Sequence, residues 1–250
     1  MQEILPQTLI ILAFVGLFAG LIDAIAGGGG LLTVPALLLA GLTPAQALGT
    51  NKLQSVFGSG SATMSYAAKG HVDFRELRVS FVLSALGSAF GALLATAVSA
   101  EFLKAFLPIL LILIALYFAF KPNLSDVPGH RRISTLLFSM TLVPVIGFYD
   151  GILGPGTGSF FMLAYVAFAG LGVLKATAYT KFLNFASNLG ALIVFILSGV
   201  LFWKVGLVMG LGQFIGARIG AGMAMKNGAK LIKPLLVTVC IALSAKLLFT

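Results

Sequence analysis

The sequence predicts an all-α polytopic membrane protein made of two inverted repeats, and three observations support this prediction. Of the 250 residues, 59% are hydrophobic and only 9% are charged, whereas a soluble domain averages about a quarter charged residues. Long apolar runs such as 102–120 and 231–249 recur along the chain, and runs of about 18 or more such residues are typical of membrane helices. The third observation is that the second half of the chain repeats the first.

Two glycine-rich stretches carry the repeat. The first reads GLIDAIAGGGGLLTVP and the second reads GFYDGILGPGTGSFF. In this alignment Asp23 corresponds to Asp150, and Lys52 corresponds to Lys181 after a two-residue difference in length. Internal repeats of this size are typical of transporter folds.

The basic residues of the loops predict that the repeats are inverted. They gather in three segments, at 69–78, in a polar joint at 123–132, and at 226–233. The positive-inside rule places all three segments in the cytoplasm. Corresponding loops of the two copies then lie on opposite sides of the membrane, and both chain termini lie outside.

The elements follow in order from these boundaries. In the first repeat, residues 1–122, we expect a re-entrant hairpin over about 8–41 and spans over about 44–67, 77–99 and 104–120. In the second repeat, residues 133–250, we expect a hairpin over about 133–170 and spans over about 174–198, 204–224 and 231–249. The apolar piece at 31–41 would be roughly 16 Å long, about half the hydrocarbon thickness, so a hairpin is favoured over three full crossings, which would satisfy the same loop charges.

Composition also excludes several functions. The net charge is +9, and in a membrane protein such an excess orients the chain rather than binding nucleic acid. The single cysteine, Cys240, cannot form an internal disulfide. The chain has no His/Cys/carboxylate cluster, metal-ligand spacing or P-loop, so we expect no catalytic residues, no metal and no cofactor.

The glycine runs predict an anion site. Exposed backbone polar groups at membrane depth are tolerated only inside protein or along a wet cavity, so each run is expected to be a buried hairpin tip. The helix after each tip would point its free N–H groups at the tip, and such helix ends attract anions. In inverted repeats the two tips would meet near the membrane midplane, although glycines in membrane helices can also serve packing alone. The candidate substrate-binding residues at the tips are Gly27, Gly28, Gly29, Gly30, Thr33, Gly154, Gly156, Thr157 and Ser159.

Polar residues after each tip complete the candidate site. Lys52 and Lys181 recur at matching positions and would provide counter-charge for an anion, or alternatively would reach to the membrane interface. Polar side chains lie within two helical turns of these lysines, where they could bind a partly hydrated oxyanion or form hydrogen bonds between helices. The candidate binding residues among them are Asn51, Gln54, Asn184 and Asn188.

The two aspartates in the apolar runs need a separate explanation, because an ionised carboxylate in the bilayer is costly and usually marks function. Asp23 and Asp150 each precede a tip glycine by four residues. They would pair with the two lysines, accept N–H bonds that lock the broken tip, or carry a proton that couples transport. The sequence alone does not distinguish these three roles.

These stretches, together with KATAYTKFLN, strongly resemble the sulfite exporter TauE/SafE family of membrane permeases over the whole chain. The resemblance implies a multi-pass protein of a bacterial or archaeal cytoplasmic membrane that transports, and usually exports, sulfur-containing anions such as sulfite, thiosulfate, sulfonates or sulfoacetate. The family motifs fall on Asp23, Gly27–Gly30, Pro35, Asn51, Lys52, Asp150, Gly154, Gly156, Lys181 and Asn184. Pro155 and Thr157 replace glycines in the second copy, so a symmetric site is not expected.

The leading functional hypothesis is therefore a secondary transporter of small sulfur oxyanions that works by alternating access, with the lipid bilayer as its surroundings. The alternatives are a transporter of small organic carboxylates and a passive anion channel. Proton coupling through Asp23 or Asp150 is a further hypothesis. The glycine-spaced helices fit either internal packing or a homodimer interface.

Overall fold

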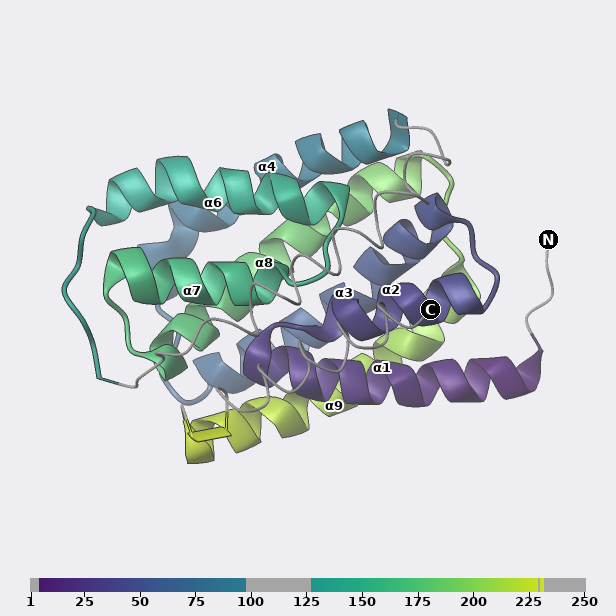
Figure 1. Cartoon of the computed structure of the whole chain (residues 1–250), viewed down its shortest axis with the longest axis horizontal. Helices are drawn as coiled ribbons and strands as arrows, with labels where there is room; N and C mark the ends of the chain where they lie inside the picture. The colour runs from purple at the N-terminus through teal and green to yellow at the C-terminus, as the bar shows by residue number, and fades with distance from the viewer. Residues whose placement is uncertain (1–4, 98–126, 229, 232–250) are drawn as a thin grey trace, which may run out of the picture.

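The computed structural model describes residues 5–97, 127–228 and 230–231, and these residues form helices joined by turns, with no strand among them. The first half contains α1 (Pro6–Ala26), α2 (Gly29–Leu39), α3 (Pro44–Ala67) and α4 (Phe74–Ala97). The second half contains α6 (Thr135–Ile152), α7 (Thr157–Ala169), α8 (Val173–Leu197) and α9 (Trp203–Asn227) (Figure 1). The expected span at 104–120 lies outside the described residues, as does the expected span at 231–249 apart from residue 231.

Local sequence signals explain where α3 and α6 begin. Thr43 and Gln46 form a reciprocal capping box at the start of α3, where Pro44 occupies the first helical position. Ser134 caps α6 by accepting a hydrogen bond from the N–H of Leu137 at 3.2 Å. The polar residues of these connections thus set the helix boundaries within a chain that is otherwise apolar.

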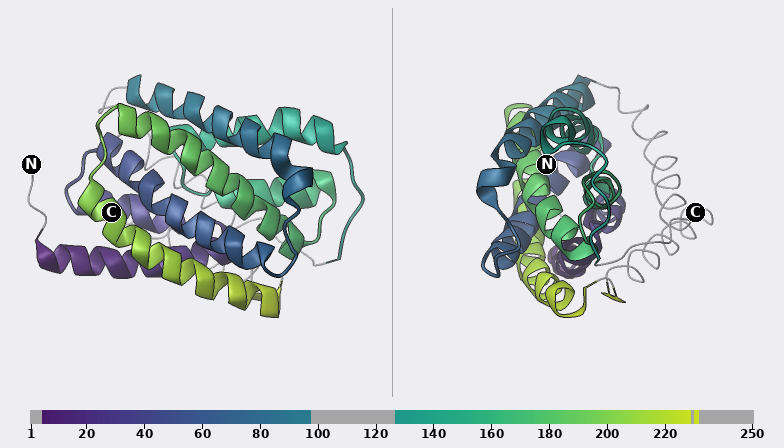
Figure 2. Two further views of the ribbon diagram at one scale, coloured as in Figure 1. Left: turned by 180° about the vertical axis from the view of Figure 1, so that it is seen from behind. Right: turned by 90° about the vertical axis from the view of Figure 1, so that its left-hand side faces the viewer.

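Corresponding helices of the two halves run in opposite directions. The helices α3 and α8 lie side by side at the centre and are antiparallel, α9 packs along α1 and α3, and α4 packs along α6 and α8 (Figures 1 and 2). The helices α1 and α6 enter the bundle from opposite ends, and each turns back in its interior into α2 or α7.

Glycines allow the outer helix pairs to pack closely. A side chain on Gly212, Gly216 or Gly220 of α9 would collide with the α1 backbone, at the carbonyl oxygens of Ala13, Leu17 and Leu21 respectively. Gly87 and Gly91 of α4 lie in the same way against the α6 carbonyls of Pro144 and Phe148. These glycine-spaced helix faces therefore serve packing within the chain.

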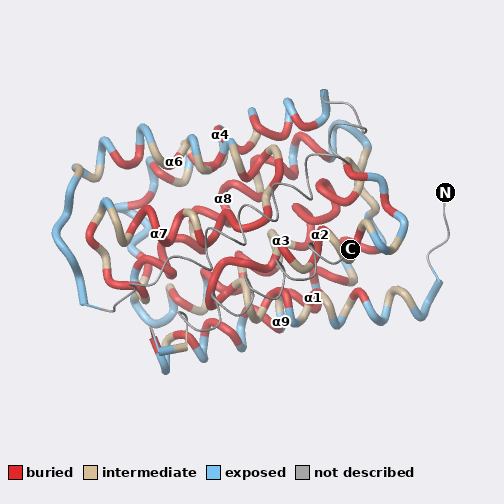
Figure 3. Tube along the Cα trace, in the orientation of Figure 1, coloured by how far each residue is buried: buried red, intermediate tan, exposed pale blue. Residues whose placement is uncertain are grey.

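Five of the described helices are long and apolar enough to cross a membrane, namely α1, α4, α6, α8 and α9. The outer faces of α1, α4 and α6 expose large hydrophobic side chains, whereas the central helices are mostly buried (Figure 3). The helix α3 has the length of a span but is too polar to qualify by composition. It buries most of its polar residues inside the bundle, where they contact other helices and not lipid.

The two arms of each hairpin differ in length. The first arms, α1 and α6, have 21 and 18 residues, and at about 1.5 Å per residue α1 alone is about 31 Å long. Only α2 and α7, with 11 and 13 residues, are short. The helix α1 accommodates its length by extending beyond the ends of its neighbours at its N-terminus (Figures 1 and 2).

Candidate functional site

Glycines in left-handed conformations make both hairpin tips. The helix α1 ends at Gly27, whose φ is 81° and whose N–H donates to the carbonyl of Asp23 at 2.8 Å. In the second hairpin Gly154 and Gly156 have φ values of 88° and 83°. Residues with a β-carbon avoid this region, so the reversal of the chain at each tip requires glycine.

The two tips pack directly against each other. Gly27 lies against the backbone of Gly158, so closely that neither position has room for a β-carbon. A β-carbon built on Gly30 would lie only 3.1 Å from the Cα of Pro155. The hydroxyl of Ser159 also donates to the carbonyl of Ala26 at 2.6 Å, which joins the start of α7 to the end of α1.

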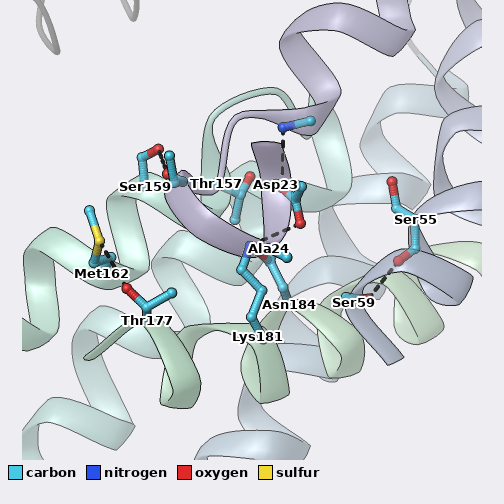
Figure 4. Close-up of polar contacts among 12 residues, drawn as sticks. Asp23, Ala24, Ser55, Ser59, Thr157, Ser159, Met162, Thr177, Lys181 and Asn184 are labelled. Carbon is cyan, nitrogen blue, oxygen red and sulfur yellow. Dashed lines mark hydrogen bonds and ion pairs between the residues drawn. The ribbon is translucent and has the colours of Figure 1, made fainter. Parts of the chain in front are cut away.

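Two ion pairs cross between the halves. Lys52 Nζ of α3 lies 2.8 Å from Asp150 Oδ1 of α6, and both side chains are almost fully buried. Lys181 Nζ of α8 lies 2.9 Å from Asp23 Oδ2 of α1, and Figure 4 shows the two side chains directed at each other. Each lysine therefore pairs with the aspartate of the opposite repeat, in a reciprocal arrangement.

The two aspartates are engaged differently. Asp23 Oδ1 also accepts a hydrogen bond from the N–H of Gly29 at 3.2 Å, so Asp23 both pairs with a lysine and holds the start of α2. The second tip is held without its aspartate, because Tyr149 donates to the carbonyl of Pro155 at 2.6 Å. Asp150 Oδ2 is buried and accepts no hydrogen bond from any described residue.

Asn51 is the centre of a small amide network on α3. Its Oδ1 accepts from Thr33 Oγ1 at 2.6 Å and from Gln54 Nε2 at 3.0 Å. Two donors on one oxygen fix the orientation of the amide, and its Nδ2 consequently faces Gly154 at the second tip. This nitrogen donates no hydrogen bond within the described part of the chain.

A small polar pocket lies between the tips. Its volume is about 20 Å³, which is room for about one water molecule. It is lined by Asp23, Gly27, Gly30, Asn51, Ser55, Asp150, Gly154, Gly156, Gly158, Asn184 and Asn188.

Both short helices direct their N-termini at this pocket. The residues that precede α2 and α7 are Gly28 and Gly156, which have no side chain to cap the helix, and Asp23 accepts only the first N–H of α2, from Gly29. The N–H groups of Gly30 and Gly158, which line the pocket, donate to no described residue. These N–H groups and the two helix dipoles contribute positive potential at the pocket, where the charges of the two lysine–aspartate pairs cancel.

The predicted site residues thus divide into two groups. The predicted residues that line the pocket are Asp23, Gly27, Gly30, Asn51, Asp150, Gly154, Gly156, Asn184 and Asn188. The other predicted residues do not line it. Lys52 and Lys181 do not line the pocket, but they form ion pairs with Asp150 and Asp23, which do. The hydroxyls of Thr33 and Ser159 bond to protein groups, as does Thr157 Oγ1, which donates to the carbonyl of Gly154 at 2.7 Å. Gly28, Gly29 and Gln54 hold the first tip and Asn51 in position.

Two lining residues, Ser55 and Gly158, were not among the predicted site residues. In the repeat alignment Gly158 corresponds to Leu31, so a comparison of the two copies gave no reason to select it. The signal that could have selected Gly158 is its place as the third glycine of the GPGTG stretch. No group of three His, Cys, Asp or Glu side chains that could hold a metal ion occurs among the described residues.

Comparison with known proteins identifies the family. The chain matches the family described as "Sulfite exporter TauE/SafE" over residues 12–247. It is 60% identical over 248 residues to "Probable membrane transporter protein ORF9" of Sinorhizobium sp, covering 99% of this chain and 95% of that relative. It is 47% identical over 244 residues to "Probable membrane transporter protein YfcA" of Escherichia coli K12, covering 98% of this chain and 91% of that relative.

A more distant relative, "Probable membrane transporter protein YunE" of Bacillus subtilis, is 26% identical over 268 residues, which cover 97% of this chain and 98% of the relative. No solved structure matches the chain. The resemblance inferred from the glycine-rich stretches is therefore confirmed. The chain belongs to the TauE/SafE family of sulfite exporters and is a multi-pass membrane protein of a transporter family rather than an enzyme.

Proposed function

We propose that this protein is a secondary transporter of small sulfur-containing oxyanions such as sulfite, thiosulfate, sulfonates or sulfoacetate. The observation that carries the proposal is that two helix N-termini with free N–H groups and two lysine–aspartate pairs converge on one pocket. Free N–H groups at a helix N-terminus bind anions without further groups, and two such ends facing one cavity suit a transported anion.

The directions of the donors favour an oxyanion with several oxygens. The N–H of Gly30, the N–H of Gly158 and the amide of Asn51 come from three different helices around the pocket. Donors that approach from separate sides match the oxygens of a pyramidal or tetrahedral group better than the two coplanar oxygens of a carboxylate. This argument favours sulfur oxyanions over small organic carboxylates.

The antiparallel course of corresponding helices supports two inverted repeats, 1–122 and 133–250, with a cytoplasmic joint at 123–132. The hairpins would be re-entrant, their tips would meet near the membrane midplane, and both termini would lie outside the cytoplasm. Rocking of one repeat against the other would open the site to each side in turn.

The size of the pocket supports a carrier rather than a passive channel. Room for about one water molecule is too little for an oxyanion of four or more heavy atoms. The described conformation is therefore a closed one, and the tips must separate before substrate enters. Direct contact between the tips blocks the continuous path that a channel requires. A carrier of this kind moves its substrate in either direction along the combined gradients.

Counterflow of radiolabelled sulfite in proteoliposomes tests this proposal. Unlabelled thiosulfate, sulfoacetate, phosphate and lactate are added separately as competitors. We expect saturable counterflow that the sulfur anions inhibit and that phosphate and lactate do not. Inhibition by lactate above all others would move the substrate to carboxylates, and flux without saturation or counterflow would indicate a channel.

A pair of lysine variants localises the site in the same assay. Lys52→Ala removes a buried cation beside the pocket, whereas Lys204→Ala removes an exposed cation at the start of α9. We expect the first to lower flux at least about tenfold, because truncating one member of a buried charged pair costs about 2–5 kcal/mol. The second is expected to transport as the unmodified protein does, and equal loss in both would argue against the tip site.

A further inference from the structure

The charges around the pocket sum to zero before any substrate binds. Lys52 balances Asp150, and Lys181 balances Asp23. An anion that enters would leave an excess negative charge at a buried site, and an uncompensated buried charge is costly. If the transport proposed above takes place, a positive charge must therefore accompany the anion.

The pocket offers one group that can supply this compensation. Asp23 uses one oxygen for Lys181 and the other for the N–H of Gly29, so releasing it would undo the first tip. Asp150 uses one oxygen for Lys52 and keeps Oδ2 buried without a hydrogen bond among the described residues. Its tip is held by Tyr149 instead.

The surroundings of Asp150 contain few other charges. Lys52 of α3 is its charged partner, and Tyr149 precedes it on α6. Of the helices packed against α6, α7 carries no charged residue, α8 carries Lys175 and Lys181, and α4 carries charges only at its start, at Arg75, Glu76 and Arg78. Lys181 is already paired with Asp23.

We propose that the substrate anion displaces Asp150 from Lys52, and that Asp150 then takes up one proton and carries it across with the anion. Lys181 and Asp23 stay paired throughout and hold the α1–α2 tip. The proton comes from water on the side from which the anion enters and forms an O–H bond at Oδ2, while Lys52 remains an ammonium group. The proton leaves with the anion on the other side, and the Lys52–Asp150 contact forms again.

The consequence is obligatory anion–proton symport. An acidic medium on the substrate side promotes net uptake, and an alkaline interior favours accumulation inside. Net export then takes place when the outward anion gradient exceeds the inward proton gradient. Because one proton binds with each anion, anion affinity is expected to fall about tenfold per unit rise in pH once Asp150 is ionised in the free protein.

A simple alkyl sulfonate such as methanesulfonate is the suitable probe, because it carries one negative charge throughout the neutral pH range. Sulfite changes its charge there, and thiosulfate carries two charges, which one proton would not balance. We would measure counterflow, net uptake driven by an imposed pH gradient, and acidification reported by a dye inside the vesicles. For the unmodified protein we expect the pH gradient to drive accumulation and one proton to enter with each anion.

Asp150→Asn is the decisive variant. It removes the titrating group and frees Lys52 of its carboxylate, so we expect tighter anion binding whose affinity changes less than about twofold per pH unit. Counterflow should become slower, because Lys52 loses its buried partner, but it should remain measurable, whereas accumulation driven by the pH gradient and the accompanying proton entry should be lost. Asp150→Glu keeps a titrating carboxylate and is expected to retain the proton coupling, which also shows whether the position tolerates substitution.

Asp23→Asn is the matched control on the other repeat. It is expected to lower the thermal stability of the purified protein and the rate of every mode of transport, while proton entry per anion stays unchanged. Uncoupling in Asp23→Asn with normal coupling in Asp150→Asn would overturn the assignment.

The outcomes separate this inference from the proposed function. If the unmodified protein shows counterflow, but an imposed pH gradient drives no accumulation and no protons enter with the anion, the coupling inference is wrong and the transporter proposal stands. If no sulfur oxyanion shows counterflow at all, the proposed function fails, and the coupling inference fails with it.

Discussion

At the residue scale, Gly27 combines two demands that are separate elsewhere in the chain. Its backbone has a φ of 81°, and its Cα hydrogens face the backbone of Gly158 with no room for a methyl group. Gly199 shares the first demand, with a φ of 68°, but nothing lies within 4 Å of its missing side chain. The two positions therefore separate backbone strain from contact between the tips.

We expect Gly27→Ala to be much more damaging than Gly199→Ala. Both substitutions place an L-residue in the left-handed region, at a cost of about 1–2 kcal/mol. Gly27→Ala must in addition push the tips apart, which adds about 1–3 kcal/mol and moves the pocket-lining groups. Thermal unfolding in detergent and sulfite counterflow measure the two effects, and equal behaviour of both variants would show that the tips do not touch.

The ion pair between Lys181 and Asp23 allows a second prediction at this scale. Lys181→Ala leaves a carboxylate without its cation, and breaking a buried pair costs about 3–5 kcal/mol. The Asp23 side chain is 20% exposed, so we expect a value near the lower end. The double variant with Asp23→Asn should be more stable than the sum of the single effects indicates.

A double-mutant cycle on detergent-solubilised protein measures this coupling. Lys181→Ala combined with Asp150→Asn is the control, because these two residues do not pair. A coupling energy near zero for Lys181 with Asp23 would contradict the reciprocal pairing. A larger coupling energy between Lys181 and Asp150 would indicate that Lys181 pairs with the aspartate of its own repeat.

At the element scale, close packing of α9 on α1 holds the first hairpin in place. Gly216 lies against the carbonyl oxygen of Leu17, and Gly222, on another face of the same helix, has open space around it. We expect Gly216→Val to cost about 1–3 kcal/mol because the helices must separate. Gly222→Val should change the unfolding temperature little, and a comparable loss in both variants would place this packing in doubt.

Much of this helical arrangement was predictable at the element scale, and the reasons differ between helices. The apolar length of Trp203–Asn227 and the capping residues around Pro44 identify helices from local sequence alone. The polar character of α3 is explained only by its buried position beside α8, since polar residues inside a bundle need partners rather than lipid. Hydropathy does not show, however, that α1 extends past its neighbours at its N-terminus (Figure 1).

The candidate site was predictable in its residue types but not in its connections. The repeat alignment selected Asp23, Asp150, Lys52 and Lys181, but it could not show that each lysine pairs with the opposite aspartate. That pairing depends on how two distant segments approach each other. The unequal use of the two carboxylates likewise follows from the different tip sequences, where Tyr149 replaces an aspartate bond in one copy only.

At the scale of the whole molecule, the inverted architecture predicts the sides on which corresponding loops lie. Gly70 follows α3 and Gly199 follows α8, and both are exposed turn residues without neighbours within 4 Å. In a Cys240→Ser background, we expect Gly70→Cys to react with an impermeant thiol reagent only from the cytoplasmic side. Gly199→Cys should react only from the outside, and labelling of both from one side would contradict the inversion.

The central claim for the whole molecule is that the two hairpin tips together form an anion site. Its most direct test is a crystal structure of the protein with thiosulfate, in which anomalous scattering locates the sulfur atoms. The account predicts the anion between the N–H groups of Gly30 and Gly158, with Lys52 turned from Asp150 toward it. Thiosulfate bound at another place, with the Lys52–Asp150 pair intact and the tips still in contact, would contradict the account.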